Sequence, residues 1–207
     1  MISGFIAKKG PMTSVFTENG KRIGVSKLIA APLTVTQIKT PQKDGYPAIQ
    51  IAYGSRKKIT NKAVSSKITK LKLDITPKGF KEFEVVSDQI PEIGKEIAID
   101  SVFSVGDTVK VTGVTKGHGF SGVIKRHGFH RQPVSGGQSD RVRAPGSIGA
   151  QTPGKVLKGK KMPGHFGNTQ KSVLNLKIVS INPETSEITL SGSVPGSYNS
   201  WVIISKS

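Results

Sequence analysis

The chain has 207 residues, of which 35% are hydrophobic, and it carries 31 Lys and Arg against 13 Asp and Glu. This length allows one large domain or two small ones with a real core, and the net charge of +18 favours an anionic partner, with nucleic acid first. The absence of cysteine excludes disulfides, thiolate metal sites and a cysteine nucleophile.

An anionic membrane is the second candidate partner for so basic a chain. Binding to a membrane surface calls for a basic amphipathic helix with a continuous apolar face, and no stretch has that pattern. No apolar run approaches the length of a membrane span, and the start Met1-Ile2-Ser3-Gly4 lacks the features of a signal peptide. The sequence therefore predicts a cytosolic protein without a membrane partner.

Short runs of β-branched residues, divided by Pro and Gly, predict several strands in the first half of the chain. These runs are residues 23–29, 33–38, 48–52, 83–86 and 96–99. One helix is predicted over residues 61–71, because Val64, Ile68 and Leu71 fall on one helical face.

Strand signals return further along the chain. Residues 109–113 alternate apolar and polar side chains after the turn Val105-Gly106-Asp107, which is typical of a half-buried strand. Residues 174–178 alternate in the same way, and a polar turn at 182–185 leads to a further apolar pair at positions 188 and 190. This last pattern predicts a β-hairpin.

Residues 116–171 differ from both flanks. They hold eleven Lys and Arg against one acid, Asp140, and twelve of the 24 glycines. They show almost no sustained apolar periodicity, so they bury too little surface to offset the entropy of ordering. The sequence therefore predicts a mainly β fold, with a closed or nearly closed barrel formed by residues 1–115 and 172–207 and a loop-like basic insertion between two of its strands.

Within the insertion, residues 117–122 read G-x-G-x-x-G, the pattern of a dinucleotide-binding turn. Such a turn needs a strand before it, a helix after it and an acid on a second strand about 20 residues further on. Gly128 is expected to interrupt the chain before a helix forms, and Asp140 lies in a polar stretch without a strand. The glycines therefore indicate close backbone approach to a partner rather than nucleotide binding.

Two other patterns in the insertion are weak indicators of chemistry. Residues 149–156 match G-x-x-x-x-G-K, but Val156 stands where a phosphate-binding loop needs a hydroxyl, and Pro153 removes an amide. The four histidines would form an all-imidazole metal site in a loop that repels cations, and Asp140 is the only carboxylate that could orient one of them for catalysis. No metal site and no catalytic residue is predicted.

The charges of the insertion suit phosphate recognition. Arg141 and Arg143 would point the same way in an extended chain, and residues 158–161 place three cations in four positions. Because acids are almost absent, an ordinary solvated surface of mixed charge is disfavoured. We expect the insertion to fold only on RNA, with binding that weakens steeply as salt rises. Its phenylalanines either stack on bases or pack against the barrel, and both alternatives stay open for Phe120, Phe129 and Phe166.

Several motifs occur in a fixed order along essentially the whole chain. They are Lys8-Lys9, Met12-Thr13, Asp44-Gly45-Tyr46, Val105-Gly106, KGHGFSGVIKR at 116–126, PGSIG at 145–149, QTPGK at 151–155, KGKKM at 158–162 and Val194-Pro195-Gly196. This set resembles the bacterial members of the large-ribosomal-subunit protein L3 family.

The resemblance implies a six-stranded barrel of the translation-protein type, with the insertion reaching toward the peptidyl-transferase centre. It implies a structural constituent of the cytoplasmic large ribosomal subunit that binds 23S-type rRNA near its 3′ end and nucleates subunit assembly. It also implies that ribosomal proteins L14 and L19 are neighbours. It implies no enzymatic activity and no cofactor, with Mg²⁺ expected only as a structural ion of the rRNA.

The resemblance and the charge pattern together give a set of expected rRNA-binding residues. These are Lys8, Lys9, Lys116, His118, Lys125, Arg126, His127, Arg131, Arg141, Arg143, Lys155, Lys158, Lys160 and Lys161. In relatives, the glutamine before Thr-Pro-Gly can be N5-methylated, which implies Gln151 as a modification site and a glutamine methyltransferase as a partner.

The chain departs from the family pattern in three places. The family opening Gly-Lys-Lys-x-Gly-Met-Thr is replaced here by Ala7-Lys8-Lys9-Gly10-Pro11-Met12-Thr13, so a different turn is expected after Lys9. Gly136 and Val142 stand where histidines are common, and the loop before Gln151 is one residue shorter.

Two other functions stay open from the residues alone. One is a small β-barrel enzyme that binds a phosphorylated ligand through residues 149–155, which nucleotide would protect against thermal unfolding. The other is a DNA-compacting protein, which would prefer duplex DNA to rRNA.

Overall fold

The computed structural model describes residues 2–57, 61–71, 73, 76–85 and 91–206. The chain divides into two compact units. The first, which we call the body, is Met1–Val114 with Gln170–Ser207, and the second, the extension, is Thr115–Thr169. The mainly β class expected from the sequence is confirmed.

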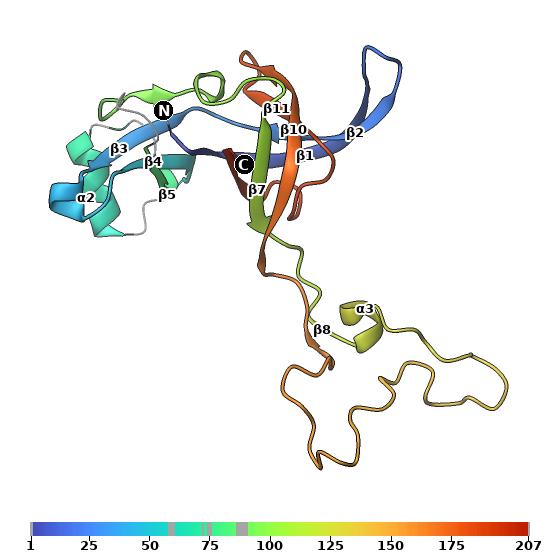
Figure 1. The fold of residues 1–207 in the computed structure, drawn as a ribbon. Helices are drawn as coiled ribbons and strands as arrows, with labels where there is room; N and C mark the ends of the chain where they lie inside the picture. Colours follow the sequence, from blue (N-terminus) through green and yellow to red (C-terminus); the bar gives the residue numbers. More distant parts are fainter. Residues whose placement is uncertain (1, 58–60, 72, 74–75, 86–90, 207) are drawn as a thin grey trace. The chain divides into compact units, whose positions relative to one another are not determined.

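Six strands of the body form a closed barrel in the order β1-β12-β7-β10-β11-β2 (Figure 1). Every neighbouring pair is antiparallel, and the circuit closes because β2 pairs with both β11 and β1. The runs expected at 23–29, 109–113 and 174–178 are all strands of this barrel, and the expected hairpin is β10 with β11. The strands are β1 (Gly4–Phe16), β2 (Arg22–Ile29), β7 (Thr108–Val114), β10 (Gln170–Asn182), β11 (Glu187–Ser191) and β12 (Trp201–Lys206).

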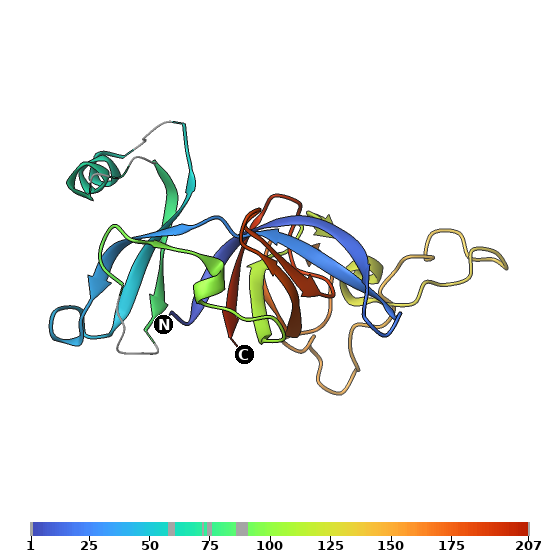
Figure 2. The same cartoon turned by 90° about the horizontal axis from the view of Figure 1, so that it is seen from above.

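The remaining expected strands do not enter the barrel. They form a separate antiparallel sheet in the order β5-β4-β3-β6, which Figure 2 shows from above. Its strands are β3 (Leu33–Lys39), β4 (Ala48–Ser55), β5 (Pro77–Glu84) and β6 (Glu96–Ile97). The prediction that all of residues 1–115 build the barrel was therefore wrong. Periodicity identifies strands but not their partners, and here strands that follow one another in the chain pair with each other.

Helices are few and short. Helix α2 (Lys62–Leu71) confirms the helix expected over 61–71, with Ile68 buried and Val64 half-buried. The strand expected over 96–99 ends early, because the chain turns into the 3₁₀ helix η1 (Ile99–Ser101). Of the strand expected over 83–86, residue 86 lies outside the described residues. The other helices are α1 (Pro41–Asp44) and α3 (Val123–His127), and no helix in the described part of the chain is long and apolar enough to cross a membrane.

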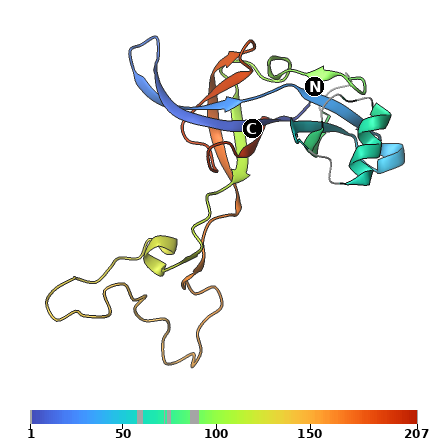
Figure 3. The ribbon, with the colours of Figure 1, turned by 180° about the vertical axis from the view of Figure 1, so that it is seen from behind.

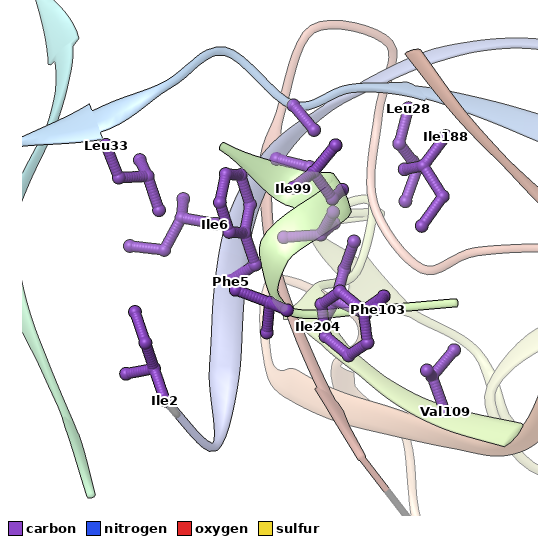
Figure 4. Close-up of a cluster of buried hydrophobic side chains, with 14 of the residues drawn as sticks. Ile2, Phe5, Ile6, Leu28, Leu33, Ile99, Phe103, Val109, Ile188 and Ile204 are labelled. Atoms are coloured by element: carbon purple, nitrogen blue, oxygen red, sulfur yellow. The ribbon is translucent and has the colours of Figure 1, made fainter. Parts of the chain in front are cut away.

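One buried apolar cluster joins the barrel to the four-stranded sheet (Figure 4). Phe5, Phe103 and Ile204 of the body are fully buried in it, and Leu33 of β3 joins them. Gly4 lets β1 approach the sheet, because a Cβ there would lie 2.7 Å from the ring of Phe83. Burial of this cluster is what stabilises the body.

Sequence reasoning did not predict two of the six barrel strands. β12 has a clear signal in Val202-Ile203-Ile204, a β-branched run of the kind used to find the other strands. β1 has a weaker one, because its four consecutive buried residues Gly4–Ala7 do not alternate. A strand covered on both faces loses the period of two.

The extension contains little regular structure, as Figure 3 shows. Two short strands pair within it, β8 (Phe120–Ser121) and β9 (Gly164–His165), and α3 follows β8. Between residues 128 and 163 no strand or helix is formed. The expectation that Gly128 prevents a helix was wrong. Gly128 instead ends α3, because it adopts φ 72° and donates its N–H to the carbonyl of Ile124.

Candidate nucleic-acid interface

The extension begins and ends in a two-stranded stem. The N–H of Thr115 donates to the carbonyl of Thr169 at 2.9 Å, and that of His118 donates to the carbonyl of Phe166 at the same distance. The N–H of Phe166 donates back across the stem to the carbonyl of Gly119 at 2.9 Å. These bonds hold the two ends of the extension together.

Aromatic rings reinforce the stem. The rings of His118 and Phe166 stack with their centroids 5.1 Å apart and their planes 20° from parallel. Phe166 is therefore packed on a neighbour within the extension, a contact that the sequence did not predict. Phe129 lies 6.0 Å from the ring of His127, whereas Phe120 is 80% exposed. Phe120 is thus the phenylalanine of the extension that is open to a stacking partner.

Two side chains of helix α3 that were expected to bind RNA contact the backbone just before β9. Nη1 of Arg126 donates to the carbonyl of Met162 at 2.6 Å, and Nε2 of His127 lies 3.0 Å from the same oxygen. Both side chains are half-buried. Gly164 makes room for this contact, because a Cβ there would lie 2.7 Å from Nη1 of Arg126. Arg126 and His127 therefore shape the protein itself, and contact with RNA stays a prediction for them.

The other expected RNA-binding residues of the extension are exposed side chains. They are Lys116, His118, Lys125, Arg131, Arg141, Arg143, Lys155, Lys158, Lys160 and Lys161. Within the described residues no ion pair involves any of them, since the salt bridges that form all lie in the body. The extension therefore presents positive charge that the protein does not neutralise, which is the arrangement required of a polyanion-binding surface.

The segment around Gln151 is a tight turn with its side chains exposed. The carbonyl of Gln151 accepts a hydrogen bond from the N–H of Gly154 at 2.9 Å. No strand leads directly into this turn and no helix directly follows it, because residues 128–163 form neither, so the G-x-x-x-x-G-K pattern of residues 149–155 lacks the strand and helix of a nucleotide-binding loop. Gln151 itself is exposed.

The N-terminal pair of expected RNA-binding residues lies in β1 of the barrel. Nζ of Lys9 donates to the carbonyls of Val194 at 2.6 Å and Gly196 at 2.8 Å, so Lys9 holds the loop before β12. Lys8 is half-buried on the same strand. The turn expected after Lys9 is instead a bulge within β1, where the register shifts before Met12. The charge pattern alone did not reveal that Lys9 holds this loop, because the pattern does not show which backbone carbonyls lie within hydrogen-bonding distance of the Lys9 ammonium group.

Comparison with known proteins identifies the relatives of the chain. The family model described as "Ribosomal protein L3" matches residues 51–203. The chain is 43% identical over 212 residues to the large ribosomal subunit protein uL3 of Syntrophobacter fumaroxidans, covering 100% of this chain and 98% of that protein. It is 41% identical over 208 residues to the protein of the same name from Alkalilimnicola ehrlichii, covering 99% and 94%. The uL3 protein of Thioalkalivibrio sulfidiphilus is 42% identical over 214 residues.

Proposed function

The chain belongs to the ribosomal protein L3 family, and from this we propose that it is a structural constituent of the large ribosomal subunit that binds large-subunit rRNA. The relatives are named as large-subunit proteins, and their alignments with this chain cover 98% and 94% of their own lengths. The observation that carries the proposal is the set of ten exposed basic side chains of the extension, none of them in an ion pair, on a backbone with few internal hydrogen bonds. A polyanion both neutralises such a segment and supplies the contacts that order it.

Several finer features of the proposal come from the family. We propose a barrel of the translation-protein type, primary binding near the 3′ end of the rRNA, an early role in assembly, and an extension that reaches toward the peptidyl-transferase centre. L14 and L19 are the proposed protein neighbours. Gln151 is the proposed methylation site, and its exposure in a tight turn supports access by a glutamine methyltransferase. The protein is not an enzyme, and the only ion proposed nearby is the Mg²⁺ of the rRNA.

Removal of the extension tests the proposal most directly. Residues 117–167 are replaced by a short Gly-Ser linker, which the Thr115–Thr169 hydrogen bonds allow because they hold the two ends together. The body should melt within a few degrees of the intact chain, since the apolar cluster is untouched. Affinity for large-subunit rRNA at about 0.1 M salt should fall by at least roughly 100-fold, and co-sedimentation with large subunits should be lost. Retained incorporation would contradict the proposal.

A charge variant gives a finer test. Lys158→Ala, Lys160→Ala and Lys161→Ala together remove three exposed cations without touching the stem. Binding should weaken for any rRNA sequence, and the slope of log affinity against log salt should become shallower by about 2 to 3. Thermal protection of the intact chain by nucleotide, or preference for duplex DNA over rRNA, would instead favour one of the two other functions left open by the sequence.

A further inference from the structure

The net charge of the chain lies in two segments, and the extension accounts for only one of them. Residues 116–171 carry eleven cations and one acid, and residues 56–81 carry nine cations and one acid, Asp74. The two segments therefore contribute +10 and +8, which together equal the total of +18 and leave the rest of the chain neutral. The cations of the second segment are Arg56, Lys57, Lys58, Lys62, Lys67, Lys70, Lys72, Lys78 and Lys81.

In the body, this second segment begins directly after β4 and contains helix α2 and the start of β5. Six of its described cations are exposed, and none of them forms an ion pair with a described residue. We call these six the second basic surface: Arg56, Lys57, Lys62, Lys70, Lys78 and Lys81.

Helix α2 divides its residues between the core and this surface. Ile68 is buried and Leu71 is half-buried, whereas Lys62 and Lys70 are exposed. Lys62 and Lys70 are eight residues apart, which places them about 12 Å apart along the helix axis. The helix contains no acidic residue to neutralise them.

Lys67 behaves differently from its neighbours and fixes the direction of the helix. Its Nζ donates to Oε1 of Gln37 at 3.3 Å and to Oε1 of Gln50, both on the four-stranded sheet. The same Nζ lies 5.0 Å from the centre of the Phe80 ring, and burial lowers the pKa of Lys67. With Ile68 buried and Lys67 bonded to the sheet, the outer lysines of α2 are held pointing away from the protein.

We propose that the second basic surface binds the phosphate backbone of an RNA double helix, independently of the extension. The inference rests on the proposed function and adds a second contact and its chemistry. The aromatic rings that contact lysines of this segment are already occupied: Nζ of Lys67 lies 5.0 Å from the half-buried Phe80 ring, and the half-buried ring of Trp201 is covered by Tyr53 at 5.1 Å and by Nζ of Lys78 at 5.7 Å. Single-stranded RNA is bound largely by stacking its bases, whereas a helix is recognised by its phosphates and shape. A surface that carries positive charge and has no unoccupied aromatic ring is therefore suited to double-helical RNA.

The experiment uses the full chain and a matched pair of charge variants. The test variant carries Lys57→Gln, Lys62→Gln, Lys70→Gln and Lys81→Gln, which leaves the contact of Lys78 with Trp201 intact. The control changes the same number of exposed lysines outside both basic segments, at Lys21, Lys43, Lys95 and Lys177. The probes are an RNA duplex of about 16 base pairs with arbitrary sequence and a single strand of the same length, titrated over a range of salt.

The test variant should bind the duplex roughly 100-fold more weakly at about 0.1 M salt, with a salt slope shallower by about 3, because each phosphate contact contributes close to one unit of slope. The control should stay within a few-fold of the unmodified chain, and both variants should keep its melting temperature because all eight side chains are exposed.

Equal losses in the two variants would show that only net charge matters and would overturn the inference. A loss for the single strand but not for the duplex would also overturn it, as would unchanged RNA binding combined with lost capture of an acidic polypeptide such as poly-glutamate. Each of these outcomes leaves the proposed function standing, provided that the unmodified chain still enters large subunits. Failure of the unmodified chain to do so would count against the proposed function itself.

Discussion

The body and the extension obtain their form in different ways. The body buries a continuous apolar cluster, and its backbone groups are paired in two sheets. In the extension, Val123 is the only apolar side chain that is fully buried, and residues 128–163 form neither helix nor strand. The difference teaches that hydrophobic burial specifies the body, whereas the extension lacks such burial and exposes charges that no ion pair of the described residues neutralises.

Glycine illustrates the same contrast. Gly4 of the body is needed for packing, because a Cβ there would lie 2.7 Å from a carbonyl oxygen of β12 and from the ring of Phe83. Gly137 of the extension adopts φ +85° with nothing near its Cβ position, so it serves only to turn the chain. Glycine thus permits close packing at Gly4 of the body, whereas at Gly137 of the extension it permits a backbone conformation that turns the chain.

A phenylalanine in each unit gives the largest expected difference. Phe5→Ala should destabilise the body by about 3–5 kcal/mol, since the ring is fully buried and its loss leaves a cavity. The melting temperature should therefore fall by roughly 10 °C. Phe120→Ala removes a ring that is 80% exposed, so the melting temperature should not change and only rRNA affinity should fall, by about tenfold. A similar loss of melting temperature in both variants would break the comparison.

Neighbouring lysines of β1 test whether a cation serves the body or the partner. Lys9→Met leaves the carbonyls of Val194 and Gly196 without their donor and should cost about 1.5–3 kcal/mol of folding free energy, measured by denaturant unfolding. Lys8→Met is the matched control, and it should leave unfolding nearly unchanged while weakening rRNA binding. Equal unfolding midpoints for the two variants would show that the Lys9 contacts do not stabilise the body.

One glycine of the stem tests how much internal order the extension has. Gly167→Ala places a Cβ 2.0 Å from the carbonyl oxygen of Lys116 and forces alanine to φ +77°, so the stem should open. Exchange of the His118 amide hydrogen should become at least about tenfold faster, since the strain is on the order of 1–3 kcal/mol. Gly117→Ala, with its nearest neighbour at 3.5 Å, is the control and should leave that exchange rate unchanged. An unaltered rate in Gly167→Ala would mean that the stem is already open.

The smallest effect is expected at Glu82, on the four-stranded sheet. Hydrogen bonds from Lys39 at 2.8 Å and from the hydroxyl of Tyr46 at 2.7 Å lower the pKa of Glu82 to about 2. Because the folded pKa lies below the ordinary value of 4.5, the carboxylate stabilises the fold above that pH and loses this contribution as pH falls toward 2. Glu82→Gln should therefore lower the melting temperature at pH 7 by a few degrees or less, with a difference that shrinks between about pH 5 and pH 2.

The matched control on the same strand is Glu84→Gln, because the Glu84 side chain is exposed and forms no ion pair in the described structure. Its melting temperature should follow that of the unmodified chain at every pH. A difference at Glu82 that stays constant from pH 7 to pH 2 would mean that the charge of this carboxylate does not contribute.

The sequence by itself determined the strands with clear alternation, the helix α2 and the limits of the basic insertion, because periodicity and charge are local properties of the chain. Tertiary structure alone decided that β3 to β6 leave the barrel and that β1 is covered on both faces, since strand partners depend on contacts distant in sequence. It also decided that Lys9 and Arg126 bond carbonyl oxygens of the protein itself, while Lys62 and Lys70 stay exposed. All four residues carry the same charge, and only the folded backbone determines which carbonyl groups lie within reach of each.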